Sequence, residues 1–252
     1  MRSVKVLASA VVACLLVAGS LQAQTASGSA KWMGVNGAWG SYNNAGSGGA
    51  VWNVYTSPYR AAFWIPSLPT DAALLPPAGT DGFGPTTDIF CVDFHHYANT
   101  GTNGVFFTNL GDANVGDYLG TYTRNASLTN YLAAAYLAEQ IRVRPDSAGV
   151  LTGAIWQIMS GQPNYWWDGS GWENVGAWAS YALNTGHDFV NADNWVVVTD
   201  GARDQGGAPV LGNTQEYITQ VRIVPEPATL LLFGTGLVMM LAAAGAFRRP
   251  TV

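Results

Sequence analysis

Residues 128–160 read LTNYLAAAYLAEQIRVRPDSAGVLTGAIWQIMS, and this stretch decides the fold class. Its apolar side chains recur at helical spacing in two blocks, which Pro145 separates. The first block predicts a helix that Ser127 or Thr129 caps and that ends before Pro145. The second block predicts a helix over 147–160, closed by Gly161. The buried stripe of this second helix is predicted to consist of Val150, Leu151, Ala154, Ile155 and Ile158.

On both sides of these helices the pattern changes to that of β-strands. One short strand is expected to contain Trp32, Val35 and Trp39, and further strands are predicted over 51–55, 88–97, 105–108, 195–199 and 215–223. Glycine and proline clusters predict loops over 43–50 and 66–85. A third helix is expected over 173–183. The fold class is therefore α+β: one domain with a mostly antiparallel sheet or sandwich and a three-helix insertion.

The strand predicted over 88–97 carries the most distinctive side chains. Alternation places Phe90, Val92 and Phe94 on one face, and it places Cys91, Asp93 and His95 on the other.

The charge of residues 24–223, which we take as the folded domain, restricts its partners. These residues contain 7 Lys or Arg and 15 Asp or Glu, so their formal net charge is −8. An acidic surface repels the phosphate backbone, and a nucleic-acid partner is therefore not expected. The 48% apolar content of the whole chain also argues against a disordered protein.

Residues 1–23 have the layout of a secretory signal peptide. Arg2 and Lys5 precede an apolar run over 6–19, and small or neutral residues precede Gln24. The run is shorter than the ~20 residues of a membrane span, which favours cleavage over a retained anchor. A lipoprotein-like box ending at Cys14 is disfavoured because the apolar run continues past it. We therefore expect export by the Sec machinery.

The C-terminal segment predicts a membrane span. Residues 228–247 carry no charge, and as a helix they match the ~30 Å core of a bilayer. Arg248 and Arg249 follow at once and would hold the tail in the cytoplasm, so the domain would face outward.

A short motif before this span suggests more than an anchor. Pro225-Glu226-Pro227 lies immediately upstream, and with the span and the arginine pair it resembles the PEP-CTERM sorting signal of Gram-negative bacteria. The resemblance covers residues 224–252. It implies an inner-membrane intermediate, processing by the membrane protease exosortase, and passage to the cell surface or exopolysaccharide matrix. A plain tail anchor is the alternative.

Three short stretches of the domain resemble a second family. Phe90-Cys91-Val92-Asp93, the segment AAYLAEQ over 134–140, and Thr152-Gly153-Ala154-Ile155-Trp156 are similar to the thioester domains of Gram-positive adhesins and to a recurring architecture among PEP-CTERM proteins. In that family a cysteine on the strand and a glutamine four residues before the tryptophan fuse into a thioester.

The decisive residue of that family differs in this sequence. Thr152 lies four residues before Trp156, and threonine has no acyl group to give Cys91. Gln140 and Gln157 lie outside the motif position. We therefore expect a relative of that fold without the reactive bond, with Cys91, Thr152 and Trp156 as vestigial positions. The alternatives are a convergent αβ pattern and, for Cys91, a small buried residue on a strand.

The sequence gives no reason to assign a catalytic residue, a metal or a cofactor. Neighbouring histidines on a strand point to opposite faces, so only one of His95 and His96 could join Asp93, and zinc usually needs three or four protein ligands. Solvated histidines at the strand end are expected. The sequence contains no Gly-x-Ser-x-Gly, His-Glu-x-x-His, phosphate-loop or calcium-loop pattern.

A tryptophan-rich loop is the remaining candidate site. Trp166, Trp167 and Trp172 lie around Asp168 and two glycines, where they could stack on sugar rings or fill the seam between helices and sheet.

Three function classes follow. The favoured class is a non-enzymatic surface or exopolysaccharide-matrix protein with a structural or adhesive role. The second is a carbohydrate-binding module that uses the Trp166–Trp172 loop, and the third is an extracellular hydrolase.

Overall fold

The protein is described by a computed structural model, which covers residues 26–46, 49–64, 83, 86–98, 101–205 and 208–220. The signal peptide predicted over 1–23, most of the loop predicted over 66–85 and the segment 224–252 lie outside these residues. No helix in the described part of the chain is long and apolar enough to cross a membrane. The described residues have an α+β fold with mostly antiparallel sheets.

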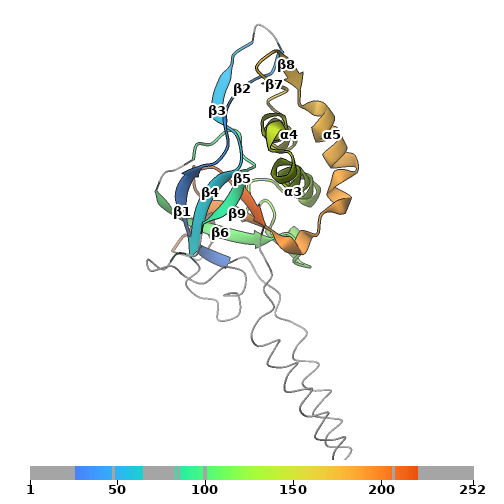
Figure 1. Cartoon of the computed structure of the whole chain (residues 1–252). Coiled ribbons are helices and arrows are strands. Elements are labelled where there is room, and N and C mark those ends of the chain that lie inside the picture. Colours follow the sequence, from blue (N-terminus) through green and yellow to red (C-terminus); the bar gives the residue numbers. More distant parts are fainter. Residues whose placement is uncertain are drawn as a thin grey trace, which may run out of the picture.

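Six antiparallel strands close into a barrel. They are β1 (Ala26–Val35), β4 (Tyr59–Trp64), β5 (Thr87–Cys91), β6 (Thr102–Asn109), β9 (Trp195–Arg203) and β11 (Tyr217–Gln220). Their order is β9-β11-β5-β4-β1-β6, and β6 pairs with β9 to complete the ring (Figure 1). The short strand β10 (Pro209–Leu211) pairs with β9 outside the ring. Closure satisfies the backbone groups that an open sheet would leave unpaired at its edges.

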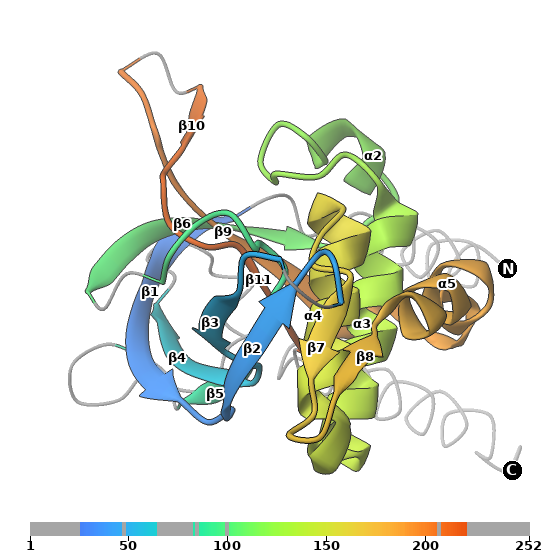
Figure 2. The same cartoon turned by 90° about the horizontal axis from the view of Figure 1, so that it is seen from above.

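A second, four-stranded sheet lies above the barrel in the view of Figure 1. It consists of β2 (Trp39–Asn43), β3 (Trp52–Tyr55), β7 (Tyr165–Trp167) and β8 (Trp172–Asn174). The order is β3-β2-β7-β8, which Figure 2 shows from left to right. Two hairpins that are more than 100 residues apart in the sequence thus share one sheet through the pairing of Tyr42 with Trp166.

The helices lie beside both sheets. They are α2 (Val115–Tyr118), α3 (Leu128–Val143), α4 (Ala148–Ser160) and α5 (Gly176–Asn184), with 3₁₀ turns at η1 (Pro145–Ser147), η2 (Gly186–Phe189) and η3 (Ala192–Asn194). Figure 1 shows α3 and α4 next to the sheets and α5 on their outer side. The core joins apolar residues of the barrel, the small sheet and all four helices.

The predicted helix boundaries are confirmed at the residues that carry them. Ser127 caps α3, because its Oγ accepts a hydrogen bond from the Asn130 amide. The helix α4 ends at Gly161, which has the left-handed φ of 76° that glycine adopts most readily. The predicted stripe on α4 was too narrow, since every residue from Gly149 to Trp156 is buried while Ile158 is only half-buried.

Several predicted strands are wrong in their extent. Trp32 and Val35 lie in β1 but Trp39 begins β2, because the chain turns between them. The predicted strand over 88–97 ends at Cys91, and the strand predicted from residue 215 begins at Tyr217. The strand β4 was not predicted. In its sequence YRAAFW, the inward-facing and outward-facing positions do not separate into apolar and polar residues.

The tryptophan-rich stretch is a hairpin instead of a loop. Asp168 turns the chain by accepting hydrogen bonds from the backbone amides of Ser170 and Gly171, at 2.7 Å each. Glu173 belongs to β8, and the third helix begins only at Gly176. The sheets are also arranged as a barrel with a separate small sheet, where the sequence predicted a sheet or sandwich.

Candidate functional site

The three thioester-like positions come together in the structure, although they lie on separate elements. The Cys91 backbone amide donates to Ser57 Oγ at 3.1 Å, and the Ser57 amide donates to Thr152 Oγ1 at 3.2 Å. Trp156 lies one turn beyond Thr152 on α4 and neighbours the Cys91 thiol. Ser57, in the β3–β4 connection, thus links the strand cysteine through its hydroxyl to the helix threonine through its backbone amide.

Cys91 itself is a buried, protonated thiol. Its side chain is fully buried, and its Sγ donates a hydrogen bond to the Asp93 carbonyl at 3.2 Å. Burial raises the pKa of the thiol to about 12, which exceeds the opposing effects of the Asp93 backbone and the neighbouring Trp156. Because the thiolate is the nucleophilic form, we expect Cys91 to be unreactive at neutral pH in this fold.

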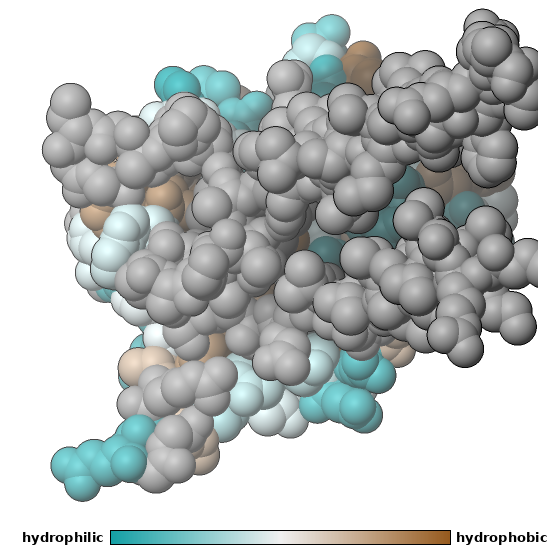
Figure 3. Space-filling view, turned by 90° about the horizontal axis from the view of Figure 1, so that it is seen from below, coloured by the Kyte–Doolittle hydropathy of each residue, from teal (hydrophilic) through white to brown (hydrophobic). Residues whose placement is uncertain are grey.

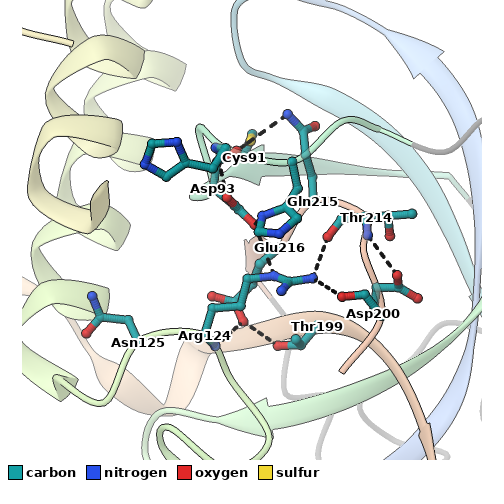
Figure 4. Close-up of polar contacts among 12 residues, drawn as sticks. Cys91, Asp93, Arg124, Asn125, Thr199, Asp200, Thr214, Gln215 and Glu216 are labelled. Atoms are coloured by element: carbon teal, nitrogen blue, oxygen red, sulfur yellow. Dashed lines mark hydrogen bonds and ion pairs between the residues drawn. The ribbon is translucent and has the colours of Figure 1, made fainter. Parts of the chain in front are cut away.

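Asp93 lies two residues beyond Cys91 and is turned into the protein (Figure 4). Its Oδ2 pairs with Arg124 Nε at 3.0 Å and with His96 Nδ1 at 2.6 Å. Its Oδ1 accepts from the His95 backbone amide at 3.0 Å. The predicted alternation of Cys91, Asp93 and His95 on one face is therefore wrong beyond Cys91. The strand β5 ends at Cys91, and beyond it the Asp93 carboxylate turns toward the partly buried Arg124.

The prediction that the histidines at the strand end are solvated is therefore only partly correct. The side chain of His96 is 34% exposed but is fixed by Asp93, whereas His95 is exposed and lies 3.4 Å from Gln162. No group of three or more histidine, cysteine or acidic side chains suited to a metal ion is found among the described residues.

Glu216 is the most deeply buried acid in Figure 4. Its carboxylate accepts hydrogen bonds from Tyr131 Oη at 2.5 Å, Thr199 Oγ1 at 2.6 Å and the Arg124 amide at 2.8 Å. Burial raises the pKa of Glu216 above its ordinary value, and these three donors oppose that rise. Glu216 was not expected as a site residue from the sequence, although an acid beside a strongly alternating strand is a signal that could have identified it.

Arg124 connects the two buried acids to a loop. Its guanidinium also donates to the carbonyls of Gly212 and Thr214, at 2.7 Å each. We call Asp93, Arg124 and Glu216 with their partners the polar node. It joins α3, the barrel strands β9 and β11, and the chain after β5. Every charged group in it is held by other groups of the fold, so its evident role is to fix these elements together.

The barrel encloses a small cavity. It is about 30 Å³ in volume and lies between residues of all six barrel strands. Its wall includes the apolar side chains of Trp32, Phe63 and Ile89, and its polar lining includes Asp200 and Gln215. This volume suits about two water molecules.

The small sheet presents a different chemistry, because aromatic side chains line both of its faces. On the inner face Tyr42 is fully buried, and its hydroxyl donates to the Gly149 carbonyl of α4 at 3.0 Å. Trp52 and Trp166 flank Tyr42 in the strand register and share this face. A Cβ atom at Gly149 would lie 2.1 Å from the Trp166 ring, so the glycine allows the indole to lie directly on the helix.

The outer face carries two aromatic pairs and a polar pair. Trp39 contacts Tyr55 with ring centroids 4.7 Å apart, and Trp167 contacts Trp172 at 5.4 Å. Beside them Ser41 Oγ donates to Asn53 Oδ1 at 2.7 Å. We call these six residues the aromatic face. The small sheet that carries it is at the top of Figure 1, and Figure 3 views the molecule from below.

The three tryptophans of the predicted site therefore separate. Trp166 is an inner-face packing residue, whereas Trp167 is 40% exposed and Trp172 is half-buried on the outer face. Trp39, which was predicted only as a strand residue, is 59% exposed and belongs with them. The sorting residues Pro225, Glu226, Pro227, Arg248 and Arg249 lie outside the described residues.

Comparison with known proteins adds no relative. No protein-family model, curated protein or solved structure matches this chain.

Proposed function

We propose that this protein is a non-enzymatic adhesive protein of the cell surface or exopolysaccharide matrix in a Gram-negative bacterium. The Sec machinery would export it through the signal peptide at 1–23. An exosortase-type protease would then release it from an inner-membrane intermediate at the signal over 224–252. The resemblance of residues 224–252 to the PEP-CTERM sorting signal is part of this proposal.

The observation that carries the proposal is the aromatic face. Tyr55, Trp39 and Trp167 are 48%, 59% and 40% exposed on one side of one sheet. A cluster of exposed aromatic side chains marks an interaction surface more often than a scattered apolar residue does. The buried acids Asp93 and Glu216, by contrast, are bound to partners within the fold. The clustering of exposed aromatic side chains therefore supports a contact surface on the small sheet.

The sorting part of the proposal is tested by fractionation. The full chain, expressed in a host that carries exosortase, should appear at the surface or in the matrix. Replacing Pro225, Glu226 and Pro227 by alanine should leave membrane insertion intact and trap the protein in the membrane fraction. Replacing Arg248 and Arg249 by glutamate should instead disturb orientation and retention. Release of the triple-alanine variant at the wild-type rate would indicate a plain tail anchor.

The adhesive part is tested in the same fractions. Trp39→Ala and Trp167→Ala should reduce matrix retention, because both remove exposed rings. Trp64→Ala is the matched control, since Trp64 is 41% exposed on the barrel strand β4. Equal retention of all three variants would contradict an adhesive role for this face.

A further inference from the structure

The strand registers place the side chains of the aromatic face in a stripe. Trp39 lies opposite Tyr55, Ser41 opposite Asn53, and Trp167 opposite Trp172. Continuing the pairing of Tyr42 with Trp166 by one residue places Trp167 beside Ser41 on the neighbouring strand. The aromatic side chains therefore cross all four strands diagonally, from Tyr55 to Trp172. Three strand spacings give the stripe a width of about 14 Å.

The ring geometry gives each end of the stripe an apolar platform. The interplanar angles are 80° for Trp39 with Tyr55 and 66° for Trp167 with Trp172. In such edge-to-face pairs one ring supports the other, and rings held in this way lose little freedom when a ligand lies on them.

The polar pair lies beside these platforms, on the same two strands as Trp39 and Tyr55 and in one register row with Trp167 and Trp172. Ser41 and Asn53 are hydrogen-bonded to each other through the serine proton and the asparagine carbonyl oxygen. The serine oxygen keeps lone pairs and the asparagine amide keeps its N–H donors for a ligand. Aromatic platforms for C–H faces, together with neutral donors and acceptors for hydroxyl groups, are the chemistry that recognises a sugar chain.

The charge of the face restricts which sugar chain fits. None of its six residues is Asp, Glu, Lys, Arg or His. The domain that carries the face has a net charge of −8 over residues 24–223. An anionic polysaccharide would meet no cation on the face and would be repelled by the rest of the domain.

We propose that the aromatic face binds an uncharged, extended polysaccharide chain, which lies diagonally across β3, β2, β7 and β8. The proposal rests on the adhesive function proposed above and names its ligand class. The face extends over all four strands of the small sheet, so it suits a long chain that contacts several strands at once.

The probe for this inference is hydroxyethyl cellulose, a soluble and uncharged β-linked glucan. Affinity electrophoresis of the full chain in mild detergent, with the polymer in the gel, should retard the wild-type protein and Trp64→Ala equally. Trp39→Ala and Trp167→Ala should bind at least about tenfold more weakly, and Ser41→Ala should bind more weakly than wild type. Alginate, an anionic polysaccharide, should give no retardation. Near-ultraviolet circular dichroism establishes that each variant is folded.

Three results would overturn the inference. The first is no retardation by hydroxyethyl cellulose, galactomannan and dextran. The second is equal retardation of Trp167→Ala and Trp64→Ala by hydroxyethyl cellulose. The third is a concentration-dependent dimer that Trp39→Ala abolishes, which would make the face a contact between two copies of this chain. If matrix retention depends on Trp39 and Trp167 but no neutral polysaccharide binds, the adhesive function stands and only this ligand class is refuted.

Discussion

Gly149→Ala tests the packing of the small sheet on α4. The added Cβ would lie 2.1 Å, 2.3 Å and 2.5 Å from Cε2, Cζ2 and Nε1 of Trp166. Ordinary contacts of a Cβ atom lie beyond 3.4 Å, so the indole or the helix must move by more than 1 Å. Overpacking of this kind costs about 1–3 kcal/mol, whereas alanine gains at most about 1 kcal/mol of helix propensity over glycine. The expected net loss of unfolding free energy is therefore about 1–2 kcal/mol.

The assay is urea unfolding of the full chain in mild detergent, followed by tryptophan fluorescence. All 10 tryptophans lie between residues 32 and 195, so the signal reports the folded domain. Gly116→Ala is the control, because a Cβ at Gly116 in α2 meets nothing within 4 Å. That variant should unfold within about 0.5 kcal/mol of wild type.

A double-mutant cycle then assigns the cost to the contact. In the Trp166→Ala background the ring is absent, so Gly149→Ala should cost nothing or stabilise slightly, and the coupling energy should be about 1–2 kcal/mol. An equal cost in both backgrounds would refute the reasoning, since Trp166 would then not be the group that the new methyl meets.

The remaining predictions concern neighbouring tryptophans, the buried thiol and the buried acid. Trp166→Ala should destabilise the domain by about 3 kcal/mol and Trp167→Ala by less than about 1 kcal/mol in urea unfolding, and the reverse order would contradict the assignment of their faces. Cys91 should resist a thiol reagent at pH 7 until urea unfolds the domain, because burial raises its pKa to about 12, and rapid native labelling would show that it is accessible. Burial raises the pKa of Glu216, so the native state binds that proton more tightly, and its contribution to stability falls as pH rises above the ordinary glutamate value. Glu216→Gln should therefore show a shallower loss of unfolding free energy than wild type does as pH rises above the ordinary glutamate pKa, and parallel profiles would exclude Glu216 as the cause.

Local signals predicted α3 and α4 well, whereas α2 was not predicted and α5 begins later than expected. Ser127, Pro145 and Gly161 fix helix ends through a cap, a break and a left-handed turn, and each acts within a few residues of itself. The barrel could not be predicted in this way, because β6 closes the ring by pairing with β9 some 90 residues later. Nothing in either strand identifies its partner, so the sequence supported only a sheet or sandwich.

The failure of the predicted strand over 88–97 has a similar origin. Its alternation continues through Asp93 and His95 in the sequence, but the strand ends at Cys91, and Asp93 pairs with Arg124 inside the protein. That partner is 31 residues away in the sequence and follows a different strand. A buried acid therefore overrode a regular local pattern, and the position of its cation was not visible without the fold.

The tryptophan stretch contained a usable signal. Asp168 and Gly171 bracket a turn between two aromatic residues that later proved to be cross-strand neighbours, Trp167 and Trp172. Two three-residue strands are too short for periodicity to reveal which residues share a face. The hairpin acquires its faces only by pairing with β2, whose Tyr42 is fixed by α4.

That pairing also explains why a binding role belongs to the sheet and not to Cys91. Trp166 and Trp167 are adjacent in the chain, and one is held on α4 while the other is 40% exposed to solvent. The inner residues Tyr42 and Trp166 thus fix the backbone from which the outer rings project. Rings on a fixed backbone lose little entropy on binding a ligand, which favours affinity without any movement of the fold. Cys91, fully buried and protonated, would require the core to open before it met a partner. Of the two sites that the sequence singled out in the domain, only the aromatic one can therefore act while the protein stays folded.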